Sequence, residues 1–166
     1  MLEPIITFES LSEWFGVMAS DVREVARLRG VRPVPRAPDV IAGLAEVHGR
    51  VVTLIDLERL LAAGETRPPY GAPAPPEGSG MEEFGVVLAL PYEHLGILVR
   101  GEVDVASGVA ESGPGPGGAA SWLRARLAVG DRLLNLLSLP DLVSRVEETI
   151  RKGFRPRSSG TLDEEN

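Results

Sequence analysis

Cysteine is absent from this 166-residue chain, and aromatic residues are scarce at 5%. Without cysteine there is no disulfide, no thiol nucleophile and no cysteine-ligated metal. Hydrophobic residues make up 43% of the chain, which is enough for a core. Because so few of them are aromatic, that core must be built mainly from aliphatic side chains. Basic residues are the minority charge: 17 Lys and Arg against 24 Asp and Glu give a net charge of −7. A chain of this charge lacks the basic field that a nucleic-acid backbone requires.

Long hydrophobic runs are also missing. No stretch approaches the roughly 18 uninterrupted apolar residues of a membrane helix, and residues 1–4 have no basic region of the kind that begins a signal peptide. The longest apolar clusters, 86–90 and 133–137, have the length of strands. We therefore expect a cytoplasmic protein.

Proline and glycine are concentrated in two stretches, 67–80 and 113–118. The first is expected to be an exposed linker, because its composition does not support a packed core. The second is expected to be a shorter loop of the same kind. The polar tail, 154–166, is expected to be disordered.

The halves on either side of the linker resemble each other. Segment 48–61 matches 130–143 at a shift of 82 positions, so that Arg50 falls on Arg132. Segment 6–8 matches 86–88 at a shift of 80 positions. Such an internal match predicts a duplicated structural unit.

Each half is predicted to consist of short strands followed by a helix. Segment 21–29 is compatible with either a strand or a helix, and Asp56 is expected to cap the first helix. Short strands with proline- and glycine-rich turns favour small barrels over a sandwich. The expected strands are 5–9, 14–19, 51–55, 86–90, 95–99 and 133–137, and the helices are 56–64 and an amphipathic 140–152.

A search for catalytic chemistry finds no convincing site. His48 and His94 have no second ligand at metal-site spacing, and no serine lies in a nucleophile elbow. Segment 113–118 formally matches a phosphate-binding glycine motif, but its two prolines lack the amide donors that would cradle a phosphate. The acidic pairs lie in polar or terminal settings, unlike the buried carboxylates of acid–base catalysis. The sequence predicts no catalytic, metal or cofactor site and favours a binding module.

Two motifs resemble those of the CheW family of chemotaxis coupling proteins. Segment 15–25, FGVMASDVREV, is similar to the family's Tyr-Gly and Val-x-Glu-Ile motif. Segment 43–57, GLAEVHGRVVTLIDL, is similar to its G-x-x-N-L-R-G-x-x-x-P-x-x-D-L signature. Segment 37–41 resembles the short proline-led helix before that signature, and 131–137 resembles the closing strand. The resemblance covers about residues 4–146.

The resemblance implies a mainly β fold: two SH3-like five-stranded barrels around a shared core, with short helices and an amphipathic C-terminal helix. It implies one CheW-like domain over 1–153, followed by the disordered tail. The expected parts are a first subdomain at about 4–64, a linker at 65–82, a second subdomain at about 83–139 and the C-terminal helix at 140–152.

The function implied is that of a non-enzymatic adaptor without a cofactor. Such an adaptor binds the regulatory domain of a CheA-type histidine kinase and the cytoplasmic tip of a methyl-accepting chemoreceptor, and is recruited to membrane-associated arrays. The alternative is a CheW-like protein that binds only the kinase, or only another motility or polarity protein. A small enzyme or a nucleic-acid-binding barrel is disfavoured by the absence of a site and by the acidic charge.

The matching positions also imply partner contacts. Val22 is expected to line the receptor groove, whose apolar wall would accept a helical partner. Each valine is equally compatible with a place in the core, and Gly43 with the end of a helix. The expected partner-binding residues are Val22, Glu24, Val25, Ile41, Gly43, His48 and Val103.

The chain departs from the family pattern within its second motif. His48 stands where the family usually has arginine, which replaces a permanent cation by a largely neutral ring near pH 7. Glu46 replaces an asparagine and Thr53 replaces a proline. These differences favour a diverged paralogue that serves an alternative chemosensory pathway.

Overall fold

The computed structural model describes residues 3–62, 81–107, 110–114 and 123–153. Within them, strands dominate and the mainly β fold is confirmed. The expected linker 67–80, most of the loop 113–118 and the tail 154–166 lie outside the described residues. The elements are β1 (Ile5–Ser10), β2 (Glu13–Met18), a 3-10 turn (Ala19–Asp21), β3 (Val22–Arg27), β4 (Ile41–Val47), β5 (Arg50–Ile55), α1 (Leu57–Ala62), β6 (Glu83–Leu88), β7 (Leu95–Arg100), β8 (Val103–Ala106), β9 (Ala110–Pro114), β10 (Leu123–Val129), β11 (Arg132–Leu137) and α2 (Leu139–Gly153).

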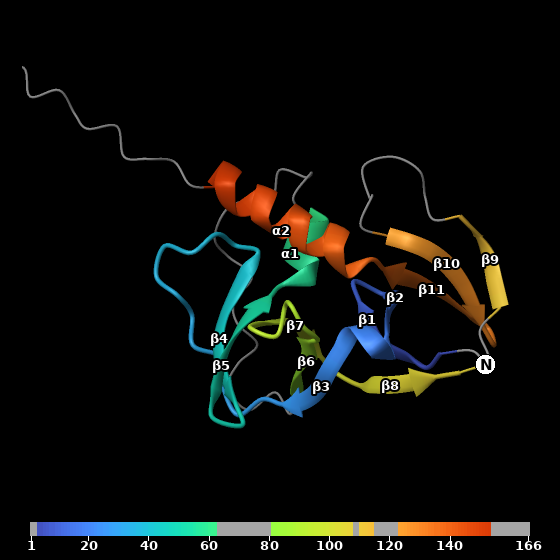
Figure 1. Ribbon diagram of the computed structural model, residues 1–166, viewed down its shortest axis with the longest axis horizontal. Helices are drawn as coiled ribbons and strands as arrows, with labels where there is room; N and C mark the ends of the chain where they lie inside the picture. The colour runs from blue at the N-terminus through green and yellow to red at the C-terminus, as the bar shows by residue number, and fades with distance from the viewer. Residues whose placement is uncertain (1–2, 63–80, 108–109, 115–122, 154–166) are drawn as a thin grey trace, which may run out of the picture.

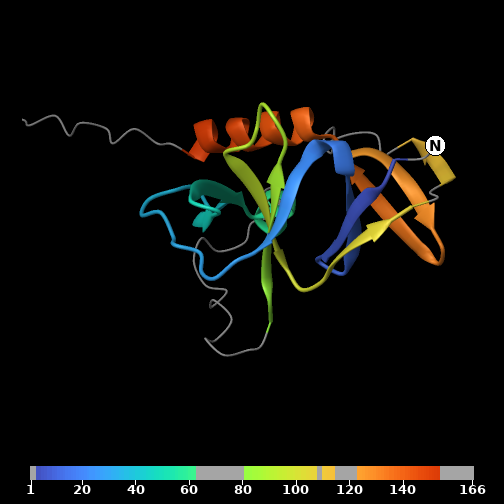
Figure 2. The same cartoon turned by 60° about the horizontal axis from the view of Figure 1, so that its bottom comes forward.

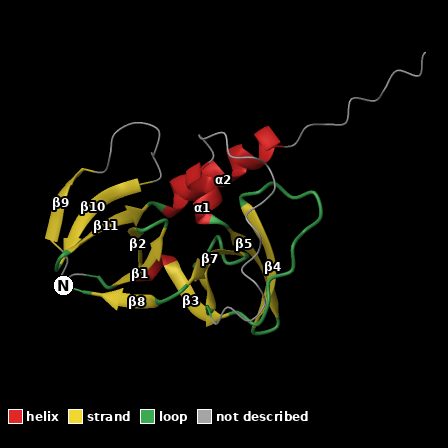
Figure 3. Ribbon diagram, turned by 180° about the vertical axis from the view of Figure 1, so that it is seen from behind, coloured by secondary structure: helices red, strands yellow, loops and turns green. Residues whose placement is uncertain are grey.

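The strands form two sheets that lie side by side (Figure 1; Figure 3, from behind). The six-stranded sheet has the order β8-β1-β2-β11-β10-β9, and the five-stranded sheet has the order β3-β6-β7-β5-β4. Parallel pairing of β2 with β11, and of β5 with β7, joins the two halves of the chain. Each sheet therefore combines strands from both sides of the linker, whereas the repeat divides the chain at the linker.

The internal repeat is confirmed by the strand pairing. The hairpins β4–β5 and β10–β11 carry the same irregularity at matching positions, between Ile41 and Gly43 in one and between Leu123 and Ala125 in the other. Gly16 and Gly96 also match: Gly16 lies opposite Leu136 in the β2–β11 pair, and Gly96 lies opposite Leu54 in the β7–β5 pair. The two sheets are thus built to one plan, with β3, β6, β7, β5 and β4 corresponding to β8, β1, β2, β11 and β10.

The main core lies between the sheets and is covered by α2, which runs along one side of both (Figure 2). Apolar side chains of α2, such as the fully buried Leu142, pack there with Phe8 and Phe15 of one sheet and Ile55 of the other. Burying one leucine side chain stabilises the folded state by about 2 kcal/mol. Because the apolar face of α2 contacts residues of both sheets, this burial holds the two sheets together. The expected C-terminal helix is confirmed, and its pair Glu148–Lys152 has an Nζ–Oε1 distance of 2.6 Å.

Local predictions are settled by backbone contacts. Segment 21–29, ambiguous in sequence, contains the strand β3, which pairs with β6. Asp56 caps α1 as expected, since its Oδ1 accepts a 3.1 Å hydrogen bond from the Arg59 amide. The short helix expected at 37–41 is wrong. The segment forms turns, in which the amide of Ile41 donates to the carbonyl of Pro38 at 2.9 Å, because the prolines around it lack helix donors and the chain then enters β4.

Candidate functional site

The β4–β5 hairpin places its turn at the surface beside β3. His48 and Gly49 form a two-residue loop between the paired residues Val47 and Arg50. Both loop residues have positive φ, 49° and 77°, which is the backbone of the type I′ turn that matches the twist of a hairpin. The ring of His48 is held out from the hairpin, with 80% of its side chain exposed.

This turn brings two expected site residues together. Nδ1 of His48 lies 2.8 Å from Oε2 of Glu24 on β3, whose side chain is 28% exposed. Beside them Glu93 accepts from Arg23 at 3.1 Å and lies 3.8 Å from Arg50. Exposed pairs of this kind contribute at most about 1 kcal/mol each. They link β3 to the hairpin and leave an exposed polar surface.

The expected apolar wall is not one continuous surface. Val25 lies on β3 and is 39% exposed, next to the Glu24–His48 contact in sequence. Val22 and Ile41 are partly buried and pack against the main core. Val103 also packs against this core, but it lies on β8 of the six-stranded sheet, opposite Phe8. Of these four residues only Val25 is an exposed large hydrophobic side chain.

Gly43 is buried on β4 and has a φ of 152°, a conformation that L side chains rarely adopt. A Cβ at this position would collide with the carbonyl oxygen of Arg32 and lie 2.8 Å from Cγ1 of Val31. At this point Arg32 and the neighbouring Leu44 exchange two backbone hydrogen bonds of 2.8 Å. The glycine therefore allows the chain after β3 to approach β4 closely.

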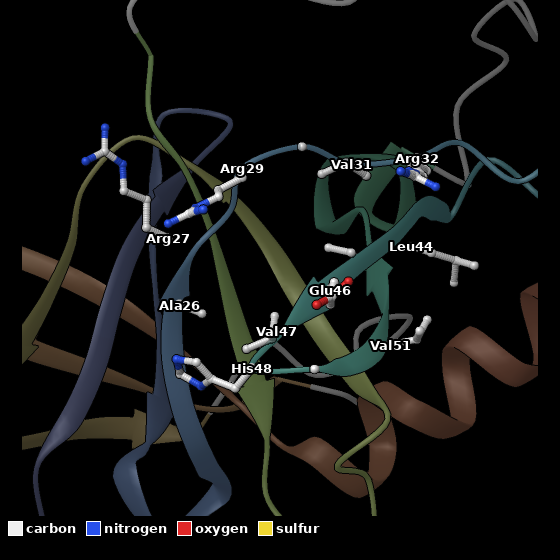
Figure 4. Close-up of a pocket in the computed structure, with 13 residues that line it drawn as sticks. Ala26, Arg27, Arg29, Val31, Arg32, Leu44, Glu46, Val47, His48 and Val51 are labelled. Atoms are coloured by element: carbon white, nitrogen blue, oxygen red, sulfur yellow. The ribbon is translucent and has the colours of Figure 1, made fainter.

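Between this bridge and the His48 turn, a groove of about 930 Å³ separates β3 from β4 (Figure 4). Arg27 and Arg29 line it on the β3 side, and Arg32 lines it beside Leu44 of β4. Sequence reasoning missed this basic lining, although the signal was present: five arginines fall between positions 23 and 36 of an acidic chain. The lining residues are Ala26, Arg27, Arg29, Gly30, Val31, Arg32, Leu44, Ala45, Glu46, Val47, His48, Gly49 and Val51.

Two carboxyl groups near the start of β3 have perturbed pKa values. Burial raises the pKa of Asp21, and the nearby charge of Glu3 adds to this effect. Hydrogen bonds from the Ser20 side chain and then from its amide lower the pKa of Glu3 itself; the amide nitrogen lies 2.7 Å from Oε1. Among the described residues no three His, Asp or Glu side chains are grouped to hold a metal. Within the same residues no helix is long and apolar enough to cross a membrane.

Comparison with known proteins agrees with this architecture. The family model of the CheW-like domain matches residues 4–147. A chemotaxis protein CheW of Klebsiella aerogenes is 28% identical over 152 residues, covering 87% of this chain and 84% of the relative. Protein FrzA of Myxococcus xanthus is 40% identical over 52 residues, covering 31% of this chain and 32% of that protein.

A solved structure shows the same fold. The scaffolding protein TtCheW from Thermoanaerobacter tengcongensis aligns with a TM-score of 0.62 at 17% identity, covering 84% of this chain and 86% of that one. The family model spans most of the sequence, and it includes both motifs and both sheets. The chain therefore belongs to the family of CheW-like domains, the coupling adaptors that its two motifs indicated.

Proposed function

We propose that this protein is a non-enzymatic adaptor that couples methyl-accepting chemoreceptors to a CheA-type histidine kinase at membrane-associated arrays. The observation that carries the proposal is the contact between Glu24 and His48. These residues lie 24 positions apart in two separate motifs, and they meet at one exposed place with a separation of 2.8 Å. The resemblance independently assigns partner contacts to both positions.

Val25 is the exposed apolar side chain of β3, with 39% of its surface exposed. It pairs with Val86 and lies on the opposite face of the strand from Glu24, which pairs with Val87. Its neighbours Arg23 and Arg27 are paired with Glu93 and Glu82. A hydrophobic side chain surrounded by charged pairs is the usual composition of a small interface centre with a polar rim. We assign Glu24, Val25 and His48 to the kinase- or receptor-binding surface. Gly43 shapes β4 beside that surface, whereas Val22, Ile41 and Val103 pack against the main core.

Two titrations test the proposal. The full chain is titrated by calorimetry with the regulatory domain of a CheA-type kinase from the same cell, and separately with a receptor cytoplasmic tip. Val25→Glu introduces a charge into the proposed interface centre and is expected to weaken binding at least about tenfold. Val105→Glu is the matched control, because Val105 is 61% exposed on β8 in the other sheet. It is expected to change affinity less than about twofold.

The outcomes separate the proposal from its alternative. Saturable binding to both partners supports the coupling role. Binding to the kinase alone, or to neither, contradicts receptor–kinase coupling and leaves the narrower role of a CheW-like protein with a single partner. Equal losses for Val25→Glu and Val105→Glu contradict the assigned surface.

The departures from the family motif support a paralogue of an alternative pathway. Protein FrzA, 40% identical over 52 residues, and the Klebsiella CheW, 28% identical over 152 residues, both match this chain. His48 in place of the usual arginine lies in the proposed surface itself. A partner that recognises this surface is expected to differ from that of a family member with arginine there.

A further inference from the structure

The free edge of β4 lies in the groove between β3 and β4. Neighbouring residues of a strand direct their backbone groups to opposite sides. The outward groups of Leu44 are used by Arg32, which exchanges two 2.8 Å hydrogen bonds with it. Glu46, two positions further along, directs its N–H and C=O to the same side. Among the described residues these two groups have no hydrogen-bond partner.

The second copy of the repeat shows what this edge accepts. Strand β10 corresponds to β4, and Ala128 of β10 corresponds to Glu46 at the shift of 82 positions. In the second copy the edge is occupied, because β9 pairs along β10 and places Ala110 opposite Ala128. In the first copy, the chain after β3 pairs with β4 through the single bridge between Arg32 and Leu44. Among the described residues, no strand therefore lies beside Glu46, although β9 fills the equivalent position beside Ala128.

The charged residues around the free edge of β4 favour a negatively charged ligand. Arg29 and Arg32 are exposed in the groove lining, and within the described part of the chain neither side chain forms an ion pair. Arg27 is already paired with Glu82 at 2.7 Å. The one carboxylate in the lining is Glu46, which opposes an acidic ligand. Two unpaired guanidinium groups against one carboxylate leave the groove basic on a chain whose net charge is −7.

We propose that an extended acidic segment of a partner protein adds as a short strand to the free edge of β4, with its carboxylates on Arg29 and Arg32. Main-chain hydrogen bonds at Glu46 give the segment its register, as in other cases of strand addition to a sheet edge. The Arg32–Leu44 bridge stops the added strand at one end. At the other end lies the exposed His48 ring, whose ion pair with Glu24 is a surface contact worth at most about 1 kcal/mol and can open for the added strand. The site does not depend on which proteins the adaptor couples.

The probe is a blocked nine-residue peptide of alternating glutamate and valine, titrated into the full chain and followed by amide NMR and hydrogen exchange. We expect saturable binding, with slowed exchange of the Glu46 amide at saturation. The same peptide with lysine in place of glutamate, and one methylated on alternate backbone nitrogens, are expected to bind at least about fivefold more weakly. These peptide controls require no change to the protein.

Matched variants locate the site. Glu46→Ala removes the opposing carboxylate and keeps the amide, so it is expected to bind the glutamate peptide more tightly. Glu46→Pro also removes the outward N–H and is expected to bind at least about fivefold more weakly than Glu46→Ala. Arg29→Ala and Arg32→Ala are expected to weaken binding, whereas Arg151→Ala on the exposed side of α2 is not.

Three results would overturn the inference. The first is no binding of the glutamate peptide at millimolar concentration. The second is that the lysine peptide or the methylated peptide binds as tightly as the glutamate peptide. Equal binding of the lysine peptide contradicts the role of charge, and equal binding of the methylated peptide contradicts strand pairing. The third is a Glu46 amide already protected from exchange in the free protein, which shows that the chain closes the groove itself.

Discussion

Gly43→Ala tests the geometry that brings β3 and β4 together, and its cost is calculable from the contacts. A φ of 152° is accessible to glycine, and holding alanine in such a region costs about 1–3 kcal/mol. The new Cβ would also collide with the carbonyl oxygen of Arg32. Relieving that collision moves the backbone that forms the two hydrogen bonds of the Arg32–Leu44 bridge, each worth about 1 kcal/mol. Because these costs overlap, we expect a loss of about 3 kcal/mol in the free energy of unfolding.

The assay is urea and thermal unfolding of the full chain, with Gly30→Ala as the matched control. Gly30 lines the same groove, but no atom lies within 4 Å of a Cβ built there. We expect the control to change stability by less than about 1 kcal/mol, whereas Gly43→Ala lowers the melting temperature by about 6–12 °C for a chain of this size. Stabilities of the two variants within about 1 kcal/mol of each other would refute the close approach at Gly43.

Three further predictions concern one core side chain and two polar side chains. Leu142→Ala is expected to cost about 3 kcal/mol in denaturant unfolding, because its side chain is fully buried beneath α2 between the sheets; a cost below about 1 kcal/mol would contradict that packing. Asn135→Ala is expected to cost about 1–3 kcal/mol, since the buried amide donates at 3.2 Å to Glu13 and to the carbonyl of Trp14, across the β11–β2 pair; the Trp14 fluorescence transition reports it, and an unchanged midpoint would show that these bonds contribute nothing. Asp21→Asn is expected to stabilise the protein at pH 7. Burial raises the pKa of Asp21, so the cost of its charge is fully present above the folded-state pKa and is lost as the pH falls below the unfolded value near 3.8; a stability difference independent of pH would contradict this assignment.

The sequence predicts the strands of high apolar content because each forms a continuous hydrophobic cluster. It also predicts the duplication, since Arg50 and Arg132 mark equivalent turns. The strands β4, β8, β9 and β10 were not predicted, because their apolar residues are interrupted by charged residues or glycine and lack such a cluster. The parallel pairs that interleave the two halves depend on contacts over a long sequence separation, for which a local pattern carries no information.

The candidate site was predicted only in part. Family resemblance pointed to Glu24 and His48 separately, and their 2.8 Å contact came from the structure. The exposed fractions distinguish the two valines of β3: Val25 is 39% exposed, while Val22 is partly buried against the main core. From the sequence alone, segment 21–29 was compatible with either a strand or a helix. The side of the segment that is exposed could therefore not be identified. The role of Gly43 likewise required the position of Arg32, which is distant in sequence.

Coupling itself is tested most directly by recruitment of the kinase to receptors. Vesicles that carry a receptor cytoplasmic tip are mixed with the CheA-type kinase and sedimented with increasing amounts of this protein. We predict that the pelleted kinase increases saturably with the full chain and with Val105→Glu, and that Val25→Glu leaves it at the level without adaptor. Sedimentation of the kinase that is unaffected by the full chain would contradict the account of this protein as a receptor–kinase coupling adaptor.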